Sequence, residues 1–271
     1  MEYYLLLIQF LLALFLFFIL FKSINYFLRL YKYKKLKSTP FPKKYQETLK
    51  NLHQYKALSP KLKEKMHLLI LLFIDQKEFI GAKMLITDEI KTIIAFYASL
   101  LRIGFALGEK DRVNTIIVYP NNFLYDEEYQ NGGIYKTETI ALEGQSANGT
   151  VVLSWQDIKQ DISQREKENV IIHEFAHELD FESGYANGTP ILESSNYRRW
   201  SEVFSTAFDR LKNLSEKDNP LGTYALTNEA EFFAVCSERF FETPKDFKED
   251  FPDIYEQLKL FYRVDTVTIL Q

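Results

Sequence analysis

The sequence predicts an α+β domain behind a single N-terminal hydrophobic helix. Three observations indicate this architecture: an uncharged apolar run near the N-terminus, short strand patterns in the middle of the chain, and helical patterns on both sides of them. After the membrane-proximal region, about 220 residues remain, enough for one large domain with its own core.

Residues 3–21 are the predicted transmembrane segment, and 1–22 the anchor. The run has no charged side chain, and as a helix it would extend about 28 Å, enough for the hydrocarbon core of a bilayer. A cleaved signal peptide is one alternative, but no basic residue precedes the run and no small-residue cleavage site follows it. A buried core helix is the other, but such a run has no polar face for solvent.

A basic segment follows the anchor. Residues 22–50 contain nine Lys or Arg and one acidic residue, Glu47. Positive flanks remain in the cytoplasm, so we expect a single-pass protein of the inner (cytoplasmic) membrane whose main domain faces the cytoplasm. Residues 23–56 are predicted to form a juxtamembrane linker that is attracted to anionic lipid.

The rest of the chain is acidic. Residues 51–271 carry 24 basic and 35 acidic side chains, so we expect no binding to nucleic acid. The single cysteine, Cys236, excludes an internal disulfide bond, as a reducing cytoplasm would predict. We expect Cys236 to be a small buried apolar residue.

The main domain is predicted over 57–271 and begins with two helices. Ser59-Pro60 should start the first, and Thr87 should start the second, which ends near Gly104. Strands are then predicted at 115–119, 135–142 and 151–155, separated by glycine-containing turns. We expect Trp155 to lie in the core rather than to bind a peptide. Helices dominate from residue 197 onward.

The helix predicted after the strands carries a metal-binding pattern. Its apolar stretch 170–179 contains the sequence His173-Glu174-Phe175-Ala176-His177. Residues four apart lie on one helix face, so the two imidazoles can bind one zinc ion. Glu174 can hold a metal-bound water and take its proton. The alternative is two surface histidines on an ordinary helix.

A third ligand should come from a later element. Because His53 and His67 both precede the motif, we expect a carboxylate. Asn228 is predicted to cap a helix that ends at Thr243-Pro244, and Glu231 in its first turn is the candidate. A carboxylate among apolar residues is costly to bury without a cation.

Two further carboxylates are candidates for supporting the ligands. Glu238 lies two turns after Glu231 on roughly the same face and can accept a hydrogen bond from a ligand histidine. Asp180 is the second candidate. If Glu231 is not a ligand, Asp180 or Glu238 is next in line. The alternative for Glu231 and Glu238 is a solvated position on a helix surface.

These residues resemble the MtfA (Mlc titration factor A) family of bacterial zinc metallopeptidases. The resemblance rests on His173–Asp180 and Asn228–Val235 and extends to Val151–Trp155 and Phe251–Tyr255, covering roughly residues 57–265. The arrangement is also similar to the catalytic domain of anthrax lethal factor. The N-terminal anchor departs from the family, whose typical member is soluble.

The resemblance implies a zincin-like fold with His173, His177 and Glu231 as Zn²⁺ ligands and Glu174 as general base. It also implies a catalytic tyrosine seven residues before the glutamate ligand, and Tyr224 occupies that position. Otherwise, Tyr224 would be one of 17 tyrosines, packed with its hydroxyl at the surface.

The predicted function is hydrolysis of a peptide or protein substrate by a zinc-activated water, at a bilayer that residues 3–21 enter. Two alternatives stay open. Some relatives in the resembled family sequester a transcriptional repressor of glucose uptake, so this chain can instead be a zinc-containing regulatory protein with little proteolysis. The other alternative is a structural anchor protein with a decayed site, against which the intact motif argues.

Overall fold

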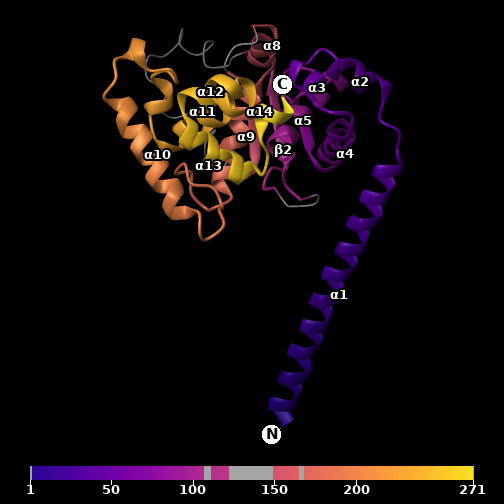
Figure 1. The fold of residues 1–271 in the computed structure, drawn as a ribbon. Helices are drawn as coiled ribbons and strands as arrows, with labels where there is room; N and C mark the ends of the chain where they lie inside the picture. Colours follow the sequence, from indigo (N-terminus) through magenta and orange to yellow (C-terminus); the bar gives the residue numbers. More distant parts are fainter. Residues whose placement is uncertain (1, 107–110, 122–148, 165–167, 271) are drawn as a thin grey trace. The chain divides into compact units, whose positions relative to one another are not determined.

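The computed structural model describes residues 2–106, 111–121, 149–164 and 168–270 (Figure 1). The chain forms two compact units, Met1–Phe41 and Pro42–Gln271. The first unit is an apolar helix, and the second combines helices with a small parallel sheet. The α+β prediction, with one apolar helix at the N-terminus, is therefore confirmed.

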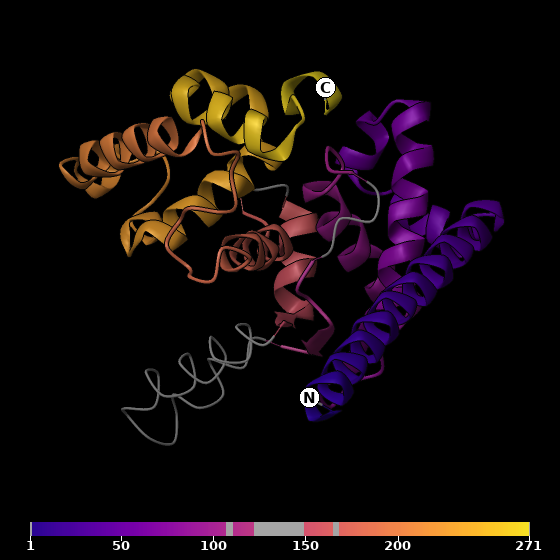
Figure 2. The ribbon, with the colours of Figure 1, turned by 90° about the horizontal axis from the view of Figure 1, so that it is seen from below.

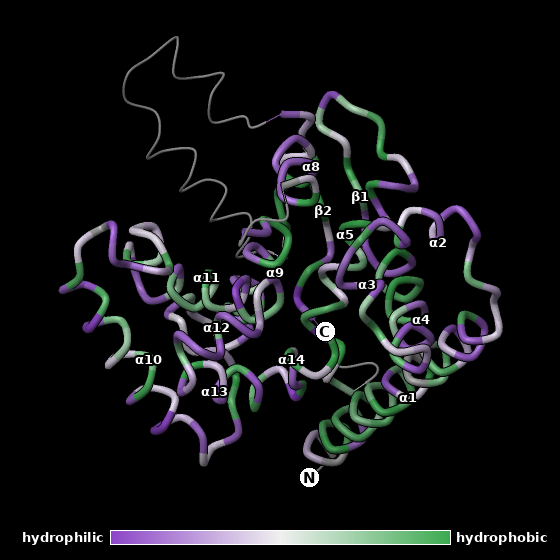
Figure 3. Tube along the Cα trace, turned by 45° about the horizontal axis from the view of Figure 1, so that its top comes forward, coloured by the Kyte–Doolittle hydropathy of each residue, from purple (hydrophilic) through white to green (hydrophobic). Residues whose placement is uncertain are grey.

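The first unit is the helix α1 (Glu2–Ser38), 37 residues long. By length and composition its stretch Leu6–Ile24 can cross a membrane, and the apolar residues follow one another along the tube in Figure 3. The helix does not end with the predicted anchor at residue 22. Leu, Lys and Arg favour helix, and the first proline of the sequence is Pro40, so the basic residues continue the same helix.

The second half of the predicted linker also differs from expectation, because it packs in the main unit. Two short helices, α2 (Lys43–Leu49) and α3 (His53–Ala57), follow Pro42. Their apolar residues Leu49, Leu52 and Tyr55 are buried. Burial of these side chains moves the start of the domain upstream of the predicted residue 57.

The two predicted front helices are confirmed together with their caps. In α4 (Pro60–Gln76) the Ser59 hydroxyl accepts from the Leu62 N–H at 3.4 Å, and in α5 (Asp88–Leu101) Thr87 accepts from the Ile90 N–H at 3.2 Å. All but three residues of α5 are buried. This helix is therefore the centre of the N-terminal part of the core.

The described strands form a parallel sheet in the order β1-β2-β3, made of β1 (Glu78–Gly81), β2 (Thr115–Tyr119) and β3 (Thr150–Ser154). The strands predicted at 115–119 and 151–155 are confirmed to within one residue. The strand predicted at 135–142 lies outside the described residues. We did not predict β1, because four residues are too few to show an alternating pattern.

Helix α8 (Trp155–Gln164) follows β3 directly and was also not predicted. The Ser154 hydroxyl accepts from the Asp157 N–H at 3.3 Å, which ends the strand and starts the helix. Trp155 is consequently the first residue of a helix. Its side chain is half-buried, so the expectation of a core residue is wrong.

The regular secondary structure described after α8 is all helical: α9 (Val170–Phe181), α10 (Tyr197–Lys212), η1 (Glu216–Asp218), η2 (Tyr224–Leu226), α11 (Glu229–Glu242), α12 (Pro244–Asp250), α13 (Pro252–Tyr262) and α14 (Thr266–Ile269). An aromatic core joins them, which includes Trp200, Phe204, Phe232, Phe233, Phe240 and Tyr262. Cys236 is buried there, as predicted.

Helix α9 lies at the centre of the main unit. It packs against α5 on one side and α11 on the other. Figure 2 shows the C-terminal helices (orange to yellow) beside α9, across from the purple helices of the N-terminal part. Segments that precede and follow α9 in the sequence therefore both pack on the helix that carries the two motif histidines.

Candidate metal centre

The two motif histidines lie on the face of α9 that meets α11. The Asn169 side chain caps the helix by accepting from the Ile172 N–H at 3.1 Å. The apolar side chains Ile171, Ile172, Phe175, Ala176 and Leu179 are buried on the other faces. The four-residue spacing therefore brings the imidazoles of His173 and His177 together, with ring centroids 4.8 Å apart.

Helix α11 supplies the carboxylate expected from a later element. Asn228 caps it, since its Oδ1 accepts from the Glu231 N–H at 2.9 Å, and the helix ends at Glu242, before Thr243-Pro244. Both predicted boundaries are confirmed. The cap places Glu231 in the first turn, opposite the histidines.

Three donor atoms converge between the two helices. Nε2 of His173 lies 3.0 Å from Oε2 of Glu231, and Nε2 of His177 lies 3.3 Å from the same oxygen. The two Nε2 atoms are 3.1 Å apart. A tetrahedral ion with bonds of about 2.0–2.1 Å has edges of about 3.3 Å, so these three atoms fit the ligand positions of one zinc ion.

Glu238 supports the His173 ring from behind. Its Oε1 lies 2.8 Å from Nδ1 of His173, and its Oε2 accepts from the Asn169 backbone N–H at 2.6 Å. A carboxylate only accepts, so Nδ1 carries a ring hydrogen, and Nε2 is the ring atom turned toward Glu231, where it would bind a metal in its deprotonated form. This is the contact predicted for Glu238.

The cluster holds more carboxylates than cations. Burial opposes protonation of His173, but hydrogen bonds with Glu231 and Glu238 outweigh burial and raise its pKa to about 10. Burial would raise the Glu231 pKa, yet hydrogen bonds with His173 and His177 hold it below its usual range. Burial raises the Glu174 pKa, and both imidazoles partly offset this. The cluster therefore attracts positive charge, as a cation site must.

Asp180 does not join this cluster through a described hydrogen bond to either histidine. It is fully buried, and its Oδ2 accepts from the Gly188 N–H at 2.6 Å. Gly188 has a φ of 72°, and a Cβ there would lie 2.3 Å from the Glu229 carbonyl oxygen. Asp180 thus holds the loop after α9 against the first turn of α11.

Tyr224 lies beside the ligands, at the start of η2. Its ring centroid is 5.8 Å from that of His173, and the side chain is 58% exposed. The pKa of its hydroxyl is raised by burial and then by the negative charge of Glu231. The hydroxyl end therefore faces the cluster, although much of the ring is open to solvent.

The sequence analysis did not identify two residues that hold the start of α9. These residues are Asn169 and Glu242. Both could have been found from local sequence patterns, because Asn169 has the position of an N-cap and Glu242 follows Glu238 by four residues on the same helix face. Asp161 of α8 also contributes, since its Oδ2 accepts from the Val170 N–H at 2.9 Å.

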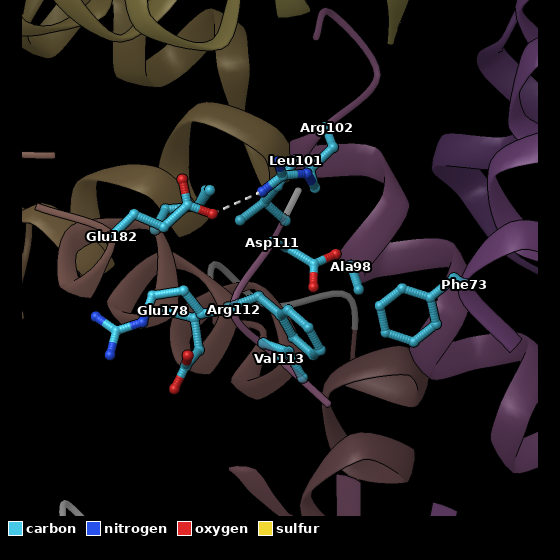
Figure 4. Close-up of a pocket in the computed structure, with 11 residues that line it drawn as sticks. Phe73, Ala98, Leu101, Arg102, Asp111, Arg112, Val113, Glu178 and Glu182 are labelled. Carbon is cyan, nitrogen blue, oxygen red and sulfur yellow. Dashed lines mark hydrogen bonds and ion pairs between the residues drawn. The ribbon is translucent and has the colours of Figure 1, made fainter. Parts of the chain in front are cut away.

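A small cavity lies on the opposite side of α9 and does not include the three donor residues. Its volume is about 10 Å³, room for about one water, and Figure 4 shows its lining and the ion pair between Arg102 and Glu182 at 3.1 Å. The cavity is therefore separate from the donor cluster.

Comparison with known proteins gives the family. The sequence pattern of the glucose-regulated metallo-peptidase M90 family matches residues 28–263. The chain belongs to this family. Among similar proteins, an uncharacterized protein of Synechocystis sp. is 35% identical over 240 residues, which are 84% of this chain and 86% of that protein.

Two other similar proteins carry the name that the motif residues suggested. Mlc titration factor A of Pectobacterium atrosepticum is 35% identical over 207 residues, 73% of this chain and 78% of that protein. The protein of the same name from Salmonella arizonae is 30% identical over 203 residues, 71% of this chain and 80% of that protein. The resemblance to the MtfA family is confirmed. A metallo-peptidase family implies a metal ion, and the His173, His177 and Glu231 cluster can hold one.

Proposed function

We propose that this chain is a zinc-dependent peptidase anchored to the membrane by its N-terminal helix. The proposal rests on three donor atoms, from His173, His177 and Glu231, that lie 3.0, 3.1 and 3.3 Å apart. Two imidazoles and one carboxylate form a common ligand set of catalytic zinc sites that keep one position open. Membership of a metallo-peptidase family supports the same activity.

The residues around the cluster suit hydrolysis of a peptide bond. A zinc ion supplies a Lewis acid that lowers the pKa of water and polarises the scissile carbonyl. Glu174 takes the proton of the attacking water and delivers it to the leaving amine. The raised Glu174 pKa supports the first step, because a more basic carboxylate takes the proton of the attacking water more readily.

Tyr224 is the proposed donor to the oxyanion that develops on the substrate. Its raised pKa keeps the hydroxyl protonated, and its place beside His173 brings it within range of a substrate carbonyl. Glu238 holds His173 in the ligand tautomer, and Asp180 shapes the adjoining loop.

The proposed location is the cytoplasmic face of the inner membrane. Residues 3–21 would enter the bilayer, and the basic residues between 22 and 50 would stay on the cytoplasmic side with the peptidase domain. An anchor raises the effective concentration of substrates that are themselves at the membrane. The proposed substrates are therefore peptides or proteins close to the membrane surface.

A second candidate function is regulation by binding. Two of the similar proteins are named Mlc titration factor A, a name that describes titration of another protein. The corresponding proposal is that the domain captures a transcriptional regulator and cleaves little.

The substitution Glu174→Gln separates the two functions, since a neutral amide cannot take up the proton. In the detergent-solubilised full chain we expect about one zinc per molecule to remain, while hydrolysis of a fluorogenic peptide falls at least about a hundredfold. Glu168→Gln, at an exposed glutamate before α9, is the control. Near-normal turnover by Glu174→Gln would refute the base assignment. Absence of turnover in the zinc-loaded parent would favour the binding function.

A further inference from the structure

Polar residues of α9 and its N-cap face carboxylates of α11 at three successive positions. On α9 they recur every four residues, and on α11 they are seven and four residues apart, so each set occupies one helix face. The helices are antiparallel, and three pairs of partners follow one another: His177 with Glu231, His173 with Glu238, and Asn169 with Glu242. The first two belong to the donor cluster, and the third lies beyond it.

The third pair is buried and fully hydrogen-bonded. Asn169 Nδ2 donates to Oε1 of Glu242 at 2.7 Å, and Gln54 Nε2 donates to Oε2 at 2.6 Å. The Glu242 side chain is 5% exposed. The Tyr97 hydroxyl donates to Oε1 of Gln54 at 3.1 Å and completes the chain of contacts. Such a network is costly to bury unless every member has a partner.

Asn169 connects this network to the ligands. Its backbone N–H donates to Glu238, whose other oxygen contacts His173. Its carbonyl oxygen accepts from the His173 N–H at 2.9 Å, and its side chain caps α9. A shift of Asn169 would therefore move both the first turn of α9 and the carboxylate that orients the His173 ring.

We propose that Glu242 is a positioning residue of the metal centre, held in place by Gln54 and acting through Asn169. It would set the register of α9 against α11, so that ligands from the two helices meet at one point. The inference rests on the proposed function only in assuming that the donor cluster binds a metal. The inference also means that α3, which carries Gln54, helps to position the metal ligands of α9 and α11, although these helices lie more than a hundred residues later in the sequence.

The hydrogen-bond polarity of the pair offers a sharp test. Glu242→Gln replaces one acceptor by a donor, so the new amide meets an N–H₂ group of either Asn169 or Gln54. Asn169→Asp keeps the cap but sets two carboxylates against each other. In the double variant the new amide at 242 donates to the new carboxylate at 169 and still accepts from Gln54. The double variant therefore restores the hydrogen bonds of residue 242 with residue 169 and Gln54, and the total charge of the pair.

The measurements use the full chain in detergent at pH 8.5. Burial, with the charges of Glu238 and Asp161, raises the Glu242 pKa to about 8, and His53 lies 3.6 Å away, so this pH favours the carboxylate. Two readouts report on the centre itself: metal affinity by competition with a chromophoric chelator, and the visible spectrum of the cobalt-substituted protein. Thermal unfolding of the metal-free protein is measured separately.

We expect each single variant to weaken metal binding about tenfold and to change the cobalt spectrum, as substitutions behind metal ligands do. The double variant should return both to within about threefold of the parent. Gln54→Ala should also weaken metal binding. It provides the test of the inference if a variant at position 169 or 242 fails to fold. Asn196→Asp, before α10, and Gln46→Ala, exposed on α2, are the matched controls.

The outcomes distinguish the inference from the proposed function. If the parent protein takes up neither zinc nor cobalt, the proposed function fails and the inference with it. If the parent binds metal but the single variants leave affinity and spectrum unchanged, only the inference is overturned. The inference would also be overturned if the double variant bound metal no more tightly than the single variant with the lower affinity. The pair would then contribute only to folding and not to the position of the ligands.

Discussion

The Nδ1 atom of His173 lies 2.8 Å from a carboxylate oxygen of Glu238, a residue 65 positions later in the chain. The contact determines the ring's orientation and its tautomer together, because the carboxylate requires a hydrogen on Nδ1. Nε2 is then the ring atom turned toward the metal position, 3.0 Å from Oε2 of Glu231. A metal ligand with a free side chain would lose entropy on binding, and this ring has already been ordered by folding.

Loss of Glu231 should remove the metal. In the full chain in detergent, we expect Glu231→Ala to retain well under half of the zinc of the parent after dialysis, because two imidazoles alone leave the ion under-coordinated. Metal analysis by mass spectrometry measures this. Glu229→Ala, an exposed residue of the same helix turn, should keep about one zinc per chain. Unchanged zinc in Glu231→Ala would exclude Glu231 as a ligand and leave Glu238 or Asp180 to be tested.

Tyr224→Phe should separate turnover from metal binding. The hydroxyl is proposed to stabilise the transition state only, so kcat should fall by about tenfold to a hundredfold while zinc content stays at the parent value. Steady-state kinetics on a fluorogenic peptide would show this split. An unchanged kcat would mean that the Tyr224 ring packs beside His173 without a catalytic role.

Asp180 should make the protein less stable as the pH rises from about 4 to about 6. Burial raises its pKa from 3.8 to about 6, so the folded state binds the proton more tightly than the unfolded state. The stability contribution is present below the unfolded pKa and is lost as the pH passes the folded value. The free energy of unfolding of Asp180→Asn should therefore rise relative to that of the parent across this window, by up to about 3 kcal/mol.

Urea unfolding of the metal-free protein at pH 4, 5 and 6.5 measures this difference. Asp209→Asn, an exposed residue of α10, is the control and should show no such trend. A constant difference between Asp180→Asn and the parent over this range would contradict the argument from burial.

The membrane topology has a direct test. If the basic residues between 22 and 50 stay in the cytoplasm, a protease added to intact spheroplasts should leave the main unit whole. The same protease should cleave it after lysis, which serves as the control for accessibility. Cleavage without lysis would place the domain outside and exclude cytoplasmic substrates.

Local patterns were sufficient for the parts of this protein that depend on neighbouring residues. Thr87, Asn228 and the pair Thr243-Pro244 mark the helix boundaries found in the structure. The spacing of His173 and His177 was informative because a helix turn of 3.6 residues fixes which side chains share a face. The strands near 115–119 and 151–155 followed from short runs of β-branched and apolar residues bounded by turns.

Features that depend on contacts between distant segments were decided only by the tertiary structure. The sequence made Glu231 and Glu238 candidates, but only the packing of α11 on α9 brings them to His173. The contact of Gln54 with Glu242 joins residues 188 apart, and no local pattern encodes it. The same reason explains why the predicted linker proved wrong beyond Pro42: whether a short helix is free or packed depends on a partner surface that its own sequence does not contain.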